Sequence, residues 1–295
     1  MNVRSVGVTA LAIVVITSML TIWFWPSIQE YMGNNPFWNG LSDFTGEMDV
    51  SSTESLSEAT DDPENTILVE ISYAEYSEND LDRIEEFVLG GGALILTDDY
   101  GYGNRVAEKL ELAVRFSGQP LLDPLFCHKN QKLPRVTDFD SELTEAGIEA
   151  IVLNHGTALL NVESQQVLAR SSAESYIDED EDETHDEDEP KRAYAVASAV
   201  PVGSGTVILL ADPSIFINSM DIDGNRAFMA YLMETYGPDR EITMDTSRLP
   251  KAPLDQGKVE LERVRERITH PYSVAAILGG VVLVVFRPWQ KKEAI

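Results

Sequence analysis

The chain has 295 residues, and 50 acidic side chains against 22 Lys and Arg give it a formal net charge of −28. With a sequence pI near 4.3, such a chain repels phosphate, which argues against nucleic acid as a partner. Hydrophobic residues make up 43% of the sequence, enough to bury a core, which argues against a disordered polyanion. Cys127, the single cysteine, allows neither an internal disulfide nor a thiolate zinc site.

The first apolar segment runs from Val6 to Trp25 and carries no charge over twenty residues. A helix of that length spans roughly 30 Å of hydrocarbon. The segment ends in aromatic residues followed by Pro26, a pattern typical of a membrane interface and a helix stop. We predict a transmembrane helix over residues 6–25. A cleaved signal peptide is the alternative, although its apolar core is usually only about 7–15 residues long.

A second apolar segment, 268–287, is predicted as another transmembrane helix, with a buried core helix as the alternative. Arg4 precedes the first segment, and no Lys or Arg follows it until Arg83. Positively charged residues favour the inner side of a membrane. The predicted location is therefore the cell membrane, with tails 1–5 and 288–295 in the cytoplasm and the main domain extracytoplasmic.

Acidic residues are dispersed along the chain as well as clustered. Self-repulsion of such a surface is tolerable in concentrated salt, because ions screen it. Our hypothesis is a halophilic host; equal folding at about 0.15 M and at molar salt would contradict it. An ordinary acidic surface is the alternative.

The main domain is predicted over residues 64–240, after a linker at 26–63 and before a juxtamembrane segment at 241–267. A buried strand at 66–71 precedes a helix whose start has capping-box spacing, Ser77 to Asp80. Glycines then lead into a second buried strand at 93–97. Strand, helix, turn and strand form a βαβ unit, which predicts parallel pairing.

Later segments extend this sheet. A strand pattern recurs at 150–153, and segments 194–200 and 206–210 flank Gly203-Ser204-Gly205, which predicts a hairpin and therefore an antiparallel strand. A last helix is expected over 223–236. Together these elements predict an α/β fold, three-layered and flavodoxin-like, with a mixed but mostly parallel sheet.

The insertion at 174–192 is expected to be disordered, because ten of the twelve residues from Asp178 to Glu189 are acidic. Calcium binding is the alternative interpretation. It is weak, since neither a glycine turn nor a fixed spacing is recognised in the segment. No metal or cofactor is predicted.

Ligands of open α/β sheets bind outside the carboxyl ends of the strands. Polar residues follow three predicted strands, and a local basic spot lies between them in the sequence. The candidate ligand-binding residues are Asp98, Asp99, Tyr100, Gly101, Tyr102, Gly103, Asn104, Lys129, Asn130, His155 and Asp212. For the first loop, a tight turn in which Asp98 or Asp99 caps the next helix is the alternative. Its two aspartates would repel a pyrophosphate, so a dinucleotide site is rejected.

Nucleophilic catalysis is not favoured. A nucleophile elbow places Cys or Ser directly after a strand, and that position holds Asp98-Asp99, whereas Cys127 lies in a later loop. No catalytic residue is therefore assigned. A hydrolase or transferase that uses the Asp98–Asn104 loop with His155 remains the alternative.

Three segments carry a family resemblance: Gly90 to Asn104, Leu121-Leu122-Asp123-Pro124 with Lys129-Asn130, and Asp212 to Asn225. They resemble an archaeal, membrane-anchored family of unknown function. That family is similar to the class I glutamine amidotransferase-like domains of gliding-motility and ABC-transporter accessory proteins. Over residues 35–240 the resemblance implies an amidotransferase fold without the catalytic cysteine. It implies a non-catalytic component that binds a ligand or protein partner in an envelope or transport-associated assembly.

Overall fold

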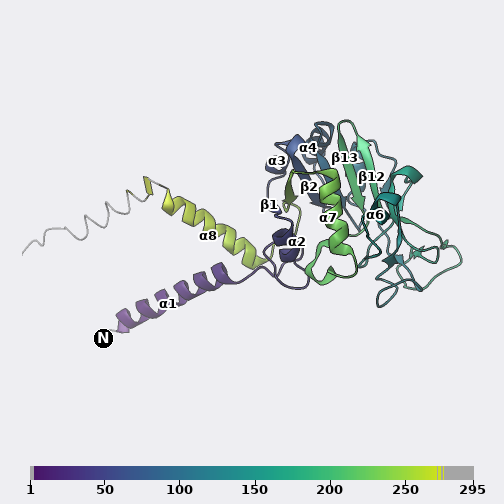
Figure 1. Cartoon of the computed structure of the whole chain (residues 1–295). Helices are drawn as coiled ribbons and strands as arrows, with labels where there is room; N and C mark the ends of the chain where they lie inside the picture. Colours follow the sequence, from purple (N-terminus) through teal and green to yellow (C-terminus); the bar gives the residue numbers. More distant parts are fainter. Residues whose placement is uncertain (1–2, 271, 274, 276–295) are drawn as a thin grey trace, which may run out of the picture. The chain divides into compact units, whose positions relative to one another are not determined.

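The computed structural model describes residues 3–270, 272, 273 and 275 (Figure 1). Two compact units are present: the α/β unit, Ile28–Pro250, and a terminal unit made of the segments on either side of it. Most of the predicted span at 268–287 lies outside the described residues, and the tail at 288–295 lies wholly outside them. Each unit is considered by itself below.

The α/β unit combines helices and short 3-10 turns with two small sheets and one large mixed sheet. Its helices are α2 (Ser42–Glu47), α3 (Leu56–Ala59), α4 (Glu78–Leu89), α5 (Asn104–Lys109), α6 (Ser141–Glu145) and α7 (Asn225–Tyr236). Its 3-10 turns are η1 (Pro63–Asn65), η2 (Ser164–Gln166), η3 (Pro213–Phe216) and η4 (Asn218–Met220).

The large sheet has ten strands, eight of them in the order β1-β14-β2-β3-β13-β12-β10-β7, with β9 beside β12 and β4 beside β9. The first five strands of this order pair in parallel and the later pairs are antiparallel. The two small sheets pair β11 with β5 and β6 with β8. The strands of all three sheets are β1 (Ser51–Thr53), β2 (Thr66–Ile71), β3 (Ala93–Thr97), β4 (Arg115–Phe116), β5 (Leu121–Leu122), β6 (Arg135–Val136), β7 (Asp138–Phe139), β8 (Ile151–Val152), β9 (Leu159–Leu160), β10 (Val167–Arg170), β11 (Tyr176–Ile177), β12 (Ala195–Val202), β13 (Gly205–Leu210) and β14 (Glu241–Asp245).

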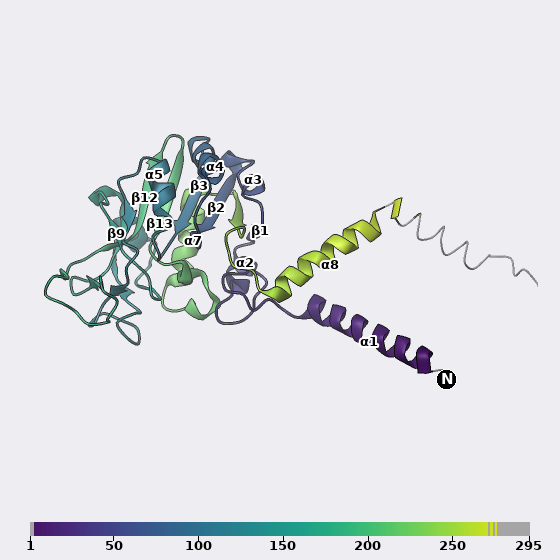
Figure 2. The ribbon, with the colours of Figure 1, turned by 180° about the vertical axis from the view of Figure 1, so that it is seen from behind.

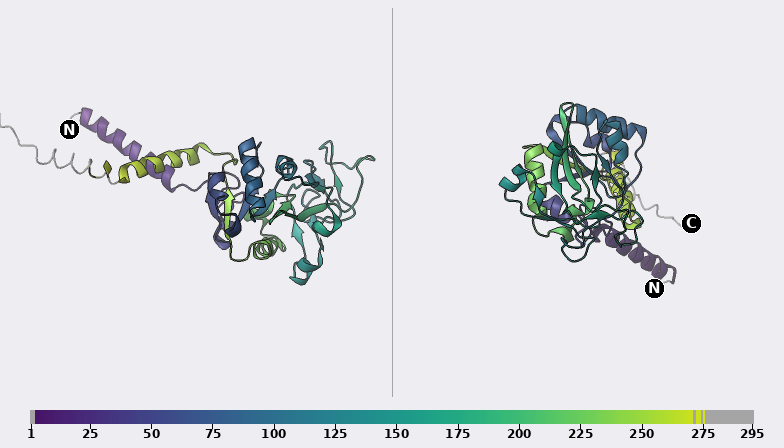
Figure 3. Two further views of the ribbon diagram at one scale, coloured as in Figure 1. Left: turned by 90° about the horizontal axis from the view of Figure 1, so that it is seen from above. Right: turned by 90° about the vertical axis from the view of Figure 1, so that its right-hand side faces the viewer.

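Helices cover both faces of the sheet. Figure 1 shows α7 in front of the strands, and the view from behind in Figure 2 brings α4 and α5 to the front. Seen from above, in Figure 3, the strands lie between these two layers. The predicted mixed α/β class, with a largely parallel sheet, is confirmed.

The first βαβ unit forms as the sequence predicts. All six residues of β2 are buried, and β2 pairs in parallel with β3. The capping box at Ser77 and Asp80 starts α4, and its apolar stripe packs into the core. Gly91 then adopts a φ of 103°, which an L side chain tolerates poorly, so the chain can turn directly into β3.

Two predicted boundaries are wrong in the structure. Residues 241–245, expected in a juxtamembrane segment, form β14, a parallel strand between β1 and β2. The segment expected as a linker, 26–63, supplies β1 and the buried side chains of Leu41 and Phe44. Neither strand was predicted, because these stretches mix polar and apolar residues and their burial depends on partners far away in the sequence.

The predicted strand at 150–153 does not extend the large sheet. Its core, β8, pairs with β6 in a separate two-stranded sheet. The buried Asn225 amide accounts for this: its Oδ1 accepts from the Val152 N–H at 2.7 Å, and its Nδ2 donates to the Val152 carbonyl at 2.9 Å. A backbone that is satisfied by a side chain is not available for a further ladder.

The terminal unit contains α1 (Val3–Phe24) and α8 (Pro253–Thr269). Over Val6–Phe24, α1 is long and apolar enough to cross a membrane, a test that signal sequences also pass. The two helices of this unit touch, because the Arg265 guanidinium lies 5.6 Å from the centre of the Trp23 ring. Ser27 donates a hydrogen bond of 2.8 Å to Asp255 at the start of α8.

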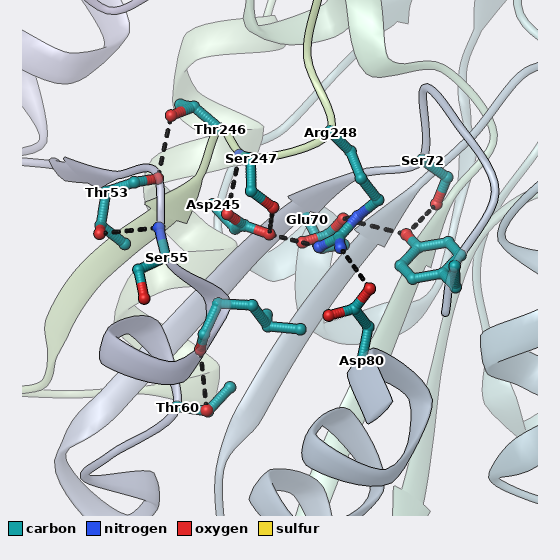
Figure 4. A network of polar contacts seen from close by, with 12 residues as sticks. Thr53, Ser55, Thr60, Glu70, Ser72, Asp80, Asp245, Thr246, Ser247 and Arg248 are labelled. Carbon is teal, nitrogen blue, oxygen red and sulfur yellow. Dashed lines mark hydrogen bonds and ion pairs between the residues drawn. The ribbon is translucent and has the colours of Figure 1, made fainter. Parts of the chain in front are cut away.

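A buried ion-pair network joins β2, β14 and α4 (Figure 4). Only 8% of the Arg248 side chain is exposed, and its Nε donates to Glu70 at 2.7 Å. The guanidinium also pairs with Asp245 and lies 3.6 Å from Asp80. Tyr76 completes the network, since its ring lies 4.5 Å from the Arg248 Cζ and its hydroxyl donates to Glu70 at 3.0 Å. One cation thus neutralises acids from neighbouring strands.

Replacing Arg248 by Met should destabilise the chain by about 3–5 kcal/mol, because Glu70 and Asp245 would stay buried without their cation. Urea unfolding of the detergent-solubilised protein measures the change. Adding Glu70→Gln to this variant should recover part of the loss. A loss below about 1 kcal/mol, the worth of an exposed pair, would contradict the assignment.

Candidate functional site

Four chain segments meet at the carboxyl edge of the parallel strands. β2 leads to Tyr73, β3 to Asp98 and Asp99, and β13 to Asp212. Because β2, β3 and β13 run in parallel, these residues gather at one edge. The start of the α/β unit joins them there, since the Tyr31 hydroxyl lies 3.1 Å from the Ser214 hydroxyl after β13.

Asp98 shapes the loop after β3. The residue is 1% exposed, and its carboxylate accepts from the N–H groups of Tyr100 at 2.8 Å, Gly101 at 2.9 Å and Gly103 at 2.6 Å. Burial raises the pKa of Asp98 to about 6, while these hydrogen bonds pull it down. The carboxylate is fully engaged with backbone, so Asp98 closes the tight turn that the alternative interpretation of this loop expected. Neither aspartate is the N-cap residue of α5, which is Gly103.

Asp212 connects two loops in the same way. Its carboxylate accepts from the Asn154 N–H at 2.6 Å and from the Ser214 N–H at 2.7 Å. Burial raises its pKa to about 8, and these backbone donors lower it. Asp212 thereby fixes the 154–157 loop against the end of β13.

Four tyrosines form a row along this edge, which we call the tyrosine row. The ring centres of Tyr31 and Tyr73 are 6.3 Å apart, those of Tyr73 and Tyr100 6.5 Å, and those of Tyr100 and Tyr102 6.4 Å. These spacings are typical of interacting aromatic pairs. Tyr31 is buried and anchors the row, whereas Tyr100 is 65% exposed and offers its ring to solvent.

Two carboxylates accompany the tyrosine row. Burial, then the charge of Asp98, raises the pKa of Asp99 to about 7, and Glu30 adds to the effect. The charge of Asp99, followed by burial, raises the pKa of the Tyr100 hydroxyl. Negative charge beside exposed aromatic faces attracts cations, which bind to both kinds of group.

The remaining residues of the predicted loop are structural. Gly101 has a φ of 92°, and the Asn104 side chain exchanges hydrogen bonds with the Phe116 backbone at 2.8 and 2.9 Å. Within the predicted set, the structure therefore separates Asp98, Gly101 and Asn104, which build the edge, from Asp99, Tyr100 and Tyr102, which present its surface.

The other predicted site residues are not part of the tyrosine row. They are Lys129, Asn130 and His155. The first two line an open hollow of about 640 Å³, together with Cys127, Lys132 and Glu183. His155 is exposed, and its N–H donates to the Lys132 carbonyl at 2.9 Å. Burial, followed by the charge of Lys132, lowers the pKa of its imidazole. The contacts found for His155 are with Lys132 and Glu183, and none of those described joins it to the Asp98 loop.

Sequence reasoning missed Glu30, Tyr31 and Tyr73. The first two lie in the segment interpreted as a linker, where no pattern indicated them. Tyr73 follows the strand at 66–71 by two residues, so the rule applied to the other strand ends would have found it.

Residues 34–233 match a family model described as "Domain of unknown function (DUF4350)". The chain belongs to the DUF4350 family. No curated protein matches this DUF4350 chain.

Several solved structures resemble it. The "mmIFT52 N-terminal domain" has a TM-score of 0.52 and 11% identity, over 72% of this chain and 95% of that one. The beta-galactosidase from Bacillus circulans sp. alkalophilus has a TM-score of 0.38 and 15% identity, over 58% of this chain and 23% of that enzyme. The beta-galactosidase from Rahnella sp. R3 has a TM-score of 0.36 and 14% identity, over 63% of this chain and 24% of that enzyme. The likeness to mmIFT52 shows a shared fold alone.

The pH dependence of the free energy of unfolding tests the assignment of a raised pKa to Asp99, the carboxyl group beside the tyrosine row. The pKa of Asp99 is higher in the folded state, about 7, than the roughly 3.9 of an unfolded chain. The folded state therefore holds its proton longer, and stability falls as pH rises from about 4 through about 7.

Asp99→Asn removes this loss. The free energy of unfolding of this variant, relative to that of the parent chain, should be about 1–3 kcal/mol higher at pH 8 than at pH 5. Urea unfolding at the two pH values measures the difference. Asp61→Asn, which neutralises an exposed acid, is the control. The same pH profile for both variants would contradict the assignment.

Proposed function

We propose that this DUF4350 protein is a membrane-anchored, non-catalytic component of an envelope or transport-associated assembly, with the α/β unit outside the cell. The observation that carries the proposal is the state of Asp98. It stands directly after β3, where a nucleophile elbow would place its nucleophile, and its carboxylate is buried and bound to three backbone N–H groups. This edge is built to hold its own loop together rather than to attack a substrate.

The tyrosine row is the proposed binding surface. Tyrosine offers a large, rigid contact area with a polar end, and it is enriched at protein interfaces. The neighbouring Glu30 and Asp99, on a chain with a net charge of −28, favour a basic partner segment whose Lys or Arg lies over the exposed Tyr100 ring. A small polar cation would satisfy the same chemistry.

The fold, in this proposal, is that of the class I glutamine amidotransferases, without their cysteine. Support comes from the parallel order β14-β2-β3-β13 and from the βαβ unit that ends at Asp98. The family resemblance of the strand-end segments implies an archaeal source. The net charge of −28 favours a halophilic one.

Cross-linking of membranes followed by purification of the protein tests the binding surface. The unaltered chain should bring down a partner, and Tyr100→Ala should lower its yield about tenfold, since truncation of an interface aromatic often costs more than 1 kcal/mol. Phe126→Ala, which also removes an exposed ring but one that is not part of the row, should leave the yield unchanged. A partner captured equally by both variants, or none at all, would contradict the proposal.

Labelling with a membrane-impermeant maleimide tests the orientation. In a Cys127→Ser background the introduced cysteine is the only thiol of the chain. Asn79→Cys, on the exposed part of α4, should react in intact cells, whereas Ser5→Cys should react only after lysis. The reverse pattern would place the α/β unit in the cytoplasm.

A further inference from the structure

The acidic insertion at 174–192, for which disorder was expected, has a defined arrangement in the structure. β11 pairs with β5, and the Arg192 N–H donates to the Ser175 carbonyl at 3.0 Å, which closes the base of the excursion. Glu189, which is 3% exposed, joins its two sides, since its carboxylate accepts from the N–H groups of Glu179 at 2.8 Å and Asp186 at 3.0 Å.

Alternate acids converge inside this loop. Carboxylate oxygens of Asp178, Asp180 and Asp182 all lie within 4.8 Å of one another. Exposed acids often cluster without a function, but Asp178 is only 1% exposed. Its Oδ2 accepts from the Glu183 N–H at 3.0 Å, whereas its Oδ1 is buried without a hydrogen-bond partner among the described residues. A buried carboxylate oxygen left unpaired is costly unless a ligand satisfies it.

Lys and Arg side chains do not neutralise the three aspartates. Within residues 3–270, none of the ion pairs found involves the three aspartates, and the neighbouring Lys132 pairs with Glu183 at 2.6 Å instead. Three carboxylates this close repel one another, and a divalent cation between them removes the repulsion.

The spacing matches a known way of holding calcium. A twelve-residue calcium loop uses side chains at positions 1, 3, 5 and 12 and turns sharply at position 6, usually through glycine. Counted from Asp178, positions 3 and 5 are Asp180 and Asp182, and position 12 is Glu189. The carboxylate of Glu189 is bound to two backbone N–H groups, so the match in ligands is limited to the three aspartates. Position 6 is Glu183, which adopts the left-handed backbone conformation, with a φ of 66°, without being glycine. The absence of glycine hid this pattern in the sequence.

We propose that the loop Asp178–Glu189 binds one calcium ion through the carboxylates of Asp178, Asp180 and Asp182, with Glu189 holding the loop closed beside them. Calcium is favoured over magnesium because three carboxylates converge on an irregular loop. Calcium accepts numerous and irregularly placed oxygen ligands, whereas magnesium requires near-octahedral geometry and is usually held by one or two carboxylates. The site is independent of the tyrosine row.

Calorimetric titration of the detergent-solubilised, chelator-treated full chain with calcium chloride tests the proposal. One site with a dissociation constant between about 10⁻⁶ and 10⁻³ M is expected. The double variant Asp180→Ala/Asp182→Ala should weaken binding at least tenfold. Its matched control is Glu179→Ala/Glu181→Ala, which removes the same charge from the same loop but leaves the converging carboxylates intact. Both variants leave the buried Asp178 in place, so the base of the loop is not disturbed.

The comparison of the two variants decides the outcome. A large loss for the aspartate pair with little change for the glutamate pair supports a coordinated site. Equal weakening by both variants would show diffuse attraction of calcium to the acidic segment, and absence of saturable binding by the parent chain would show no site; either result overturns the proposal. Repeating the titration in molar KCl separates coordination from diffuse attraction, because salt screens only the latter strongly.

Discussion

Buried carboxylates that bind backbone N–H groups hold the working edge of this protein together. Asp98 binds three N–H groups of the loop after β3, and Asp212 joins the loop after β13 to the chain near Asn154. A buried carboxylate without such donors would be protonated or would destabilise the fold. Arg248 solves the same problem for Glu70 and Asp245 with a cation. The other features of this edge depend on these fixed loops.

The fixed loops explain how this strand edge can form a binding surface in place of a catalytic site. With Asp98 engaged internally, the groups that the edge presents are the exposed Tyr100 and the half-buried Tyr102 and Asp99. Tyr31 extends the row inward and ties it to Ser214, so the aromatic surface is held rigidly by buried contacts. Rigid aromatic groups lose little entropy on binding, which suits them to recognising a partner.

Two acidic regions of the chain thus have different physical characters. At the strand edge, burial raises the pKa of Asp99 and Asp212, so part of the charge is suppressed near neutral pH. In the loop from Asp178 to Glu189 the acids stay close together, and an ion from solution is the natural neutralising partner. A net charge alone does not distinguish these cases, because it says nothing about which oxygens already have donors.

The sequence by itself determined the local elements: the apolar helix near the N-terminus, the βαβ unit around Ser77 and Gly91, and the hairpin at Gly203. Each depends on periodicity, capping or turn residues within a few positions of one another. Only the tertiary structure decided that β14 enters the sheet between β1 and β2, that Tyr31 reaches the strand edge, and that alternate aspartates after β11 converge. These outcomes depend on contacts between distant segments, whose burial and pairing no local pattern encodes.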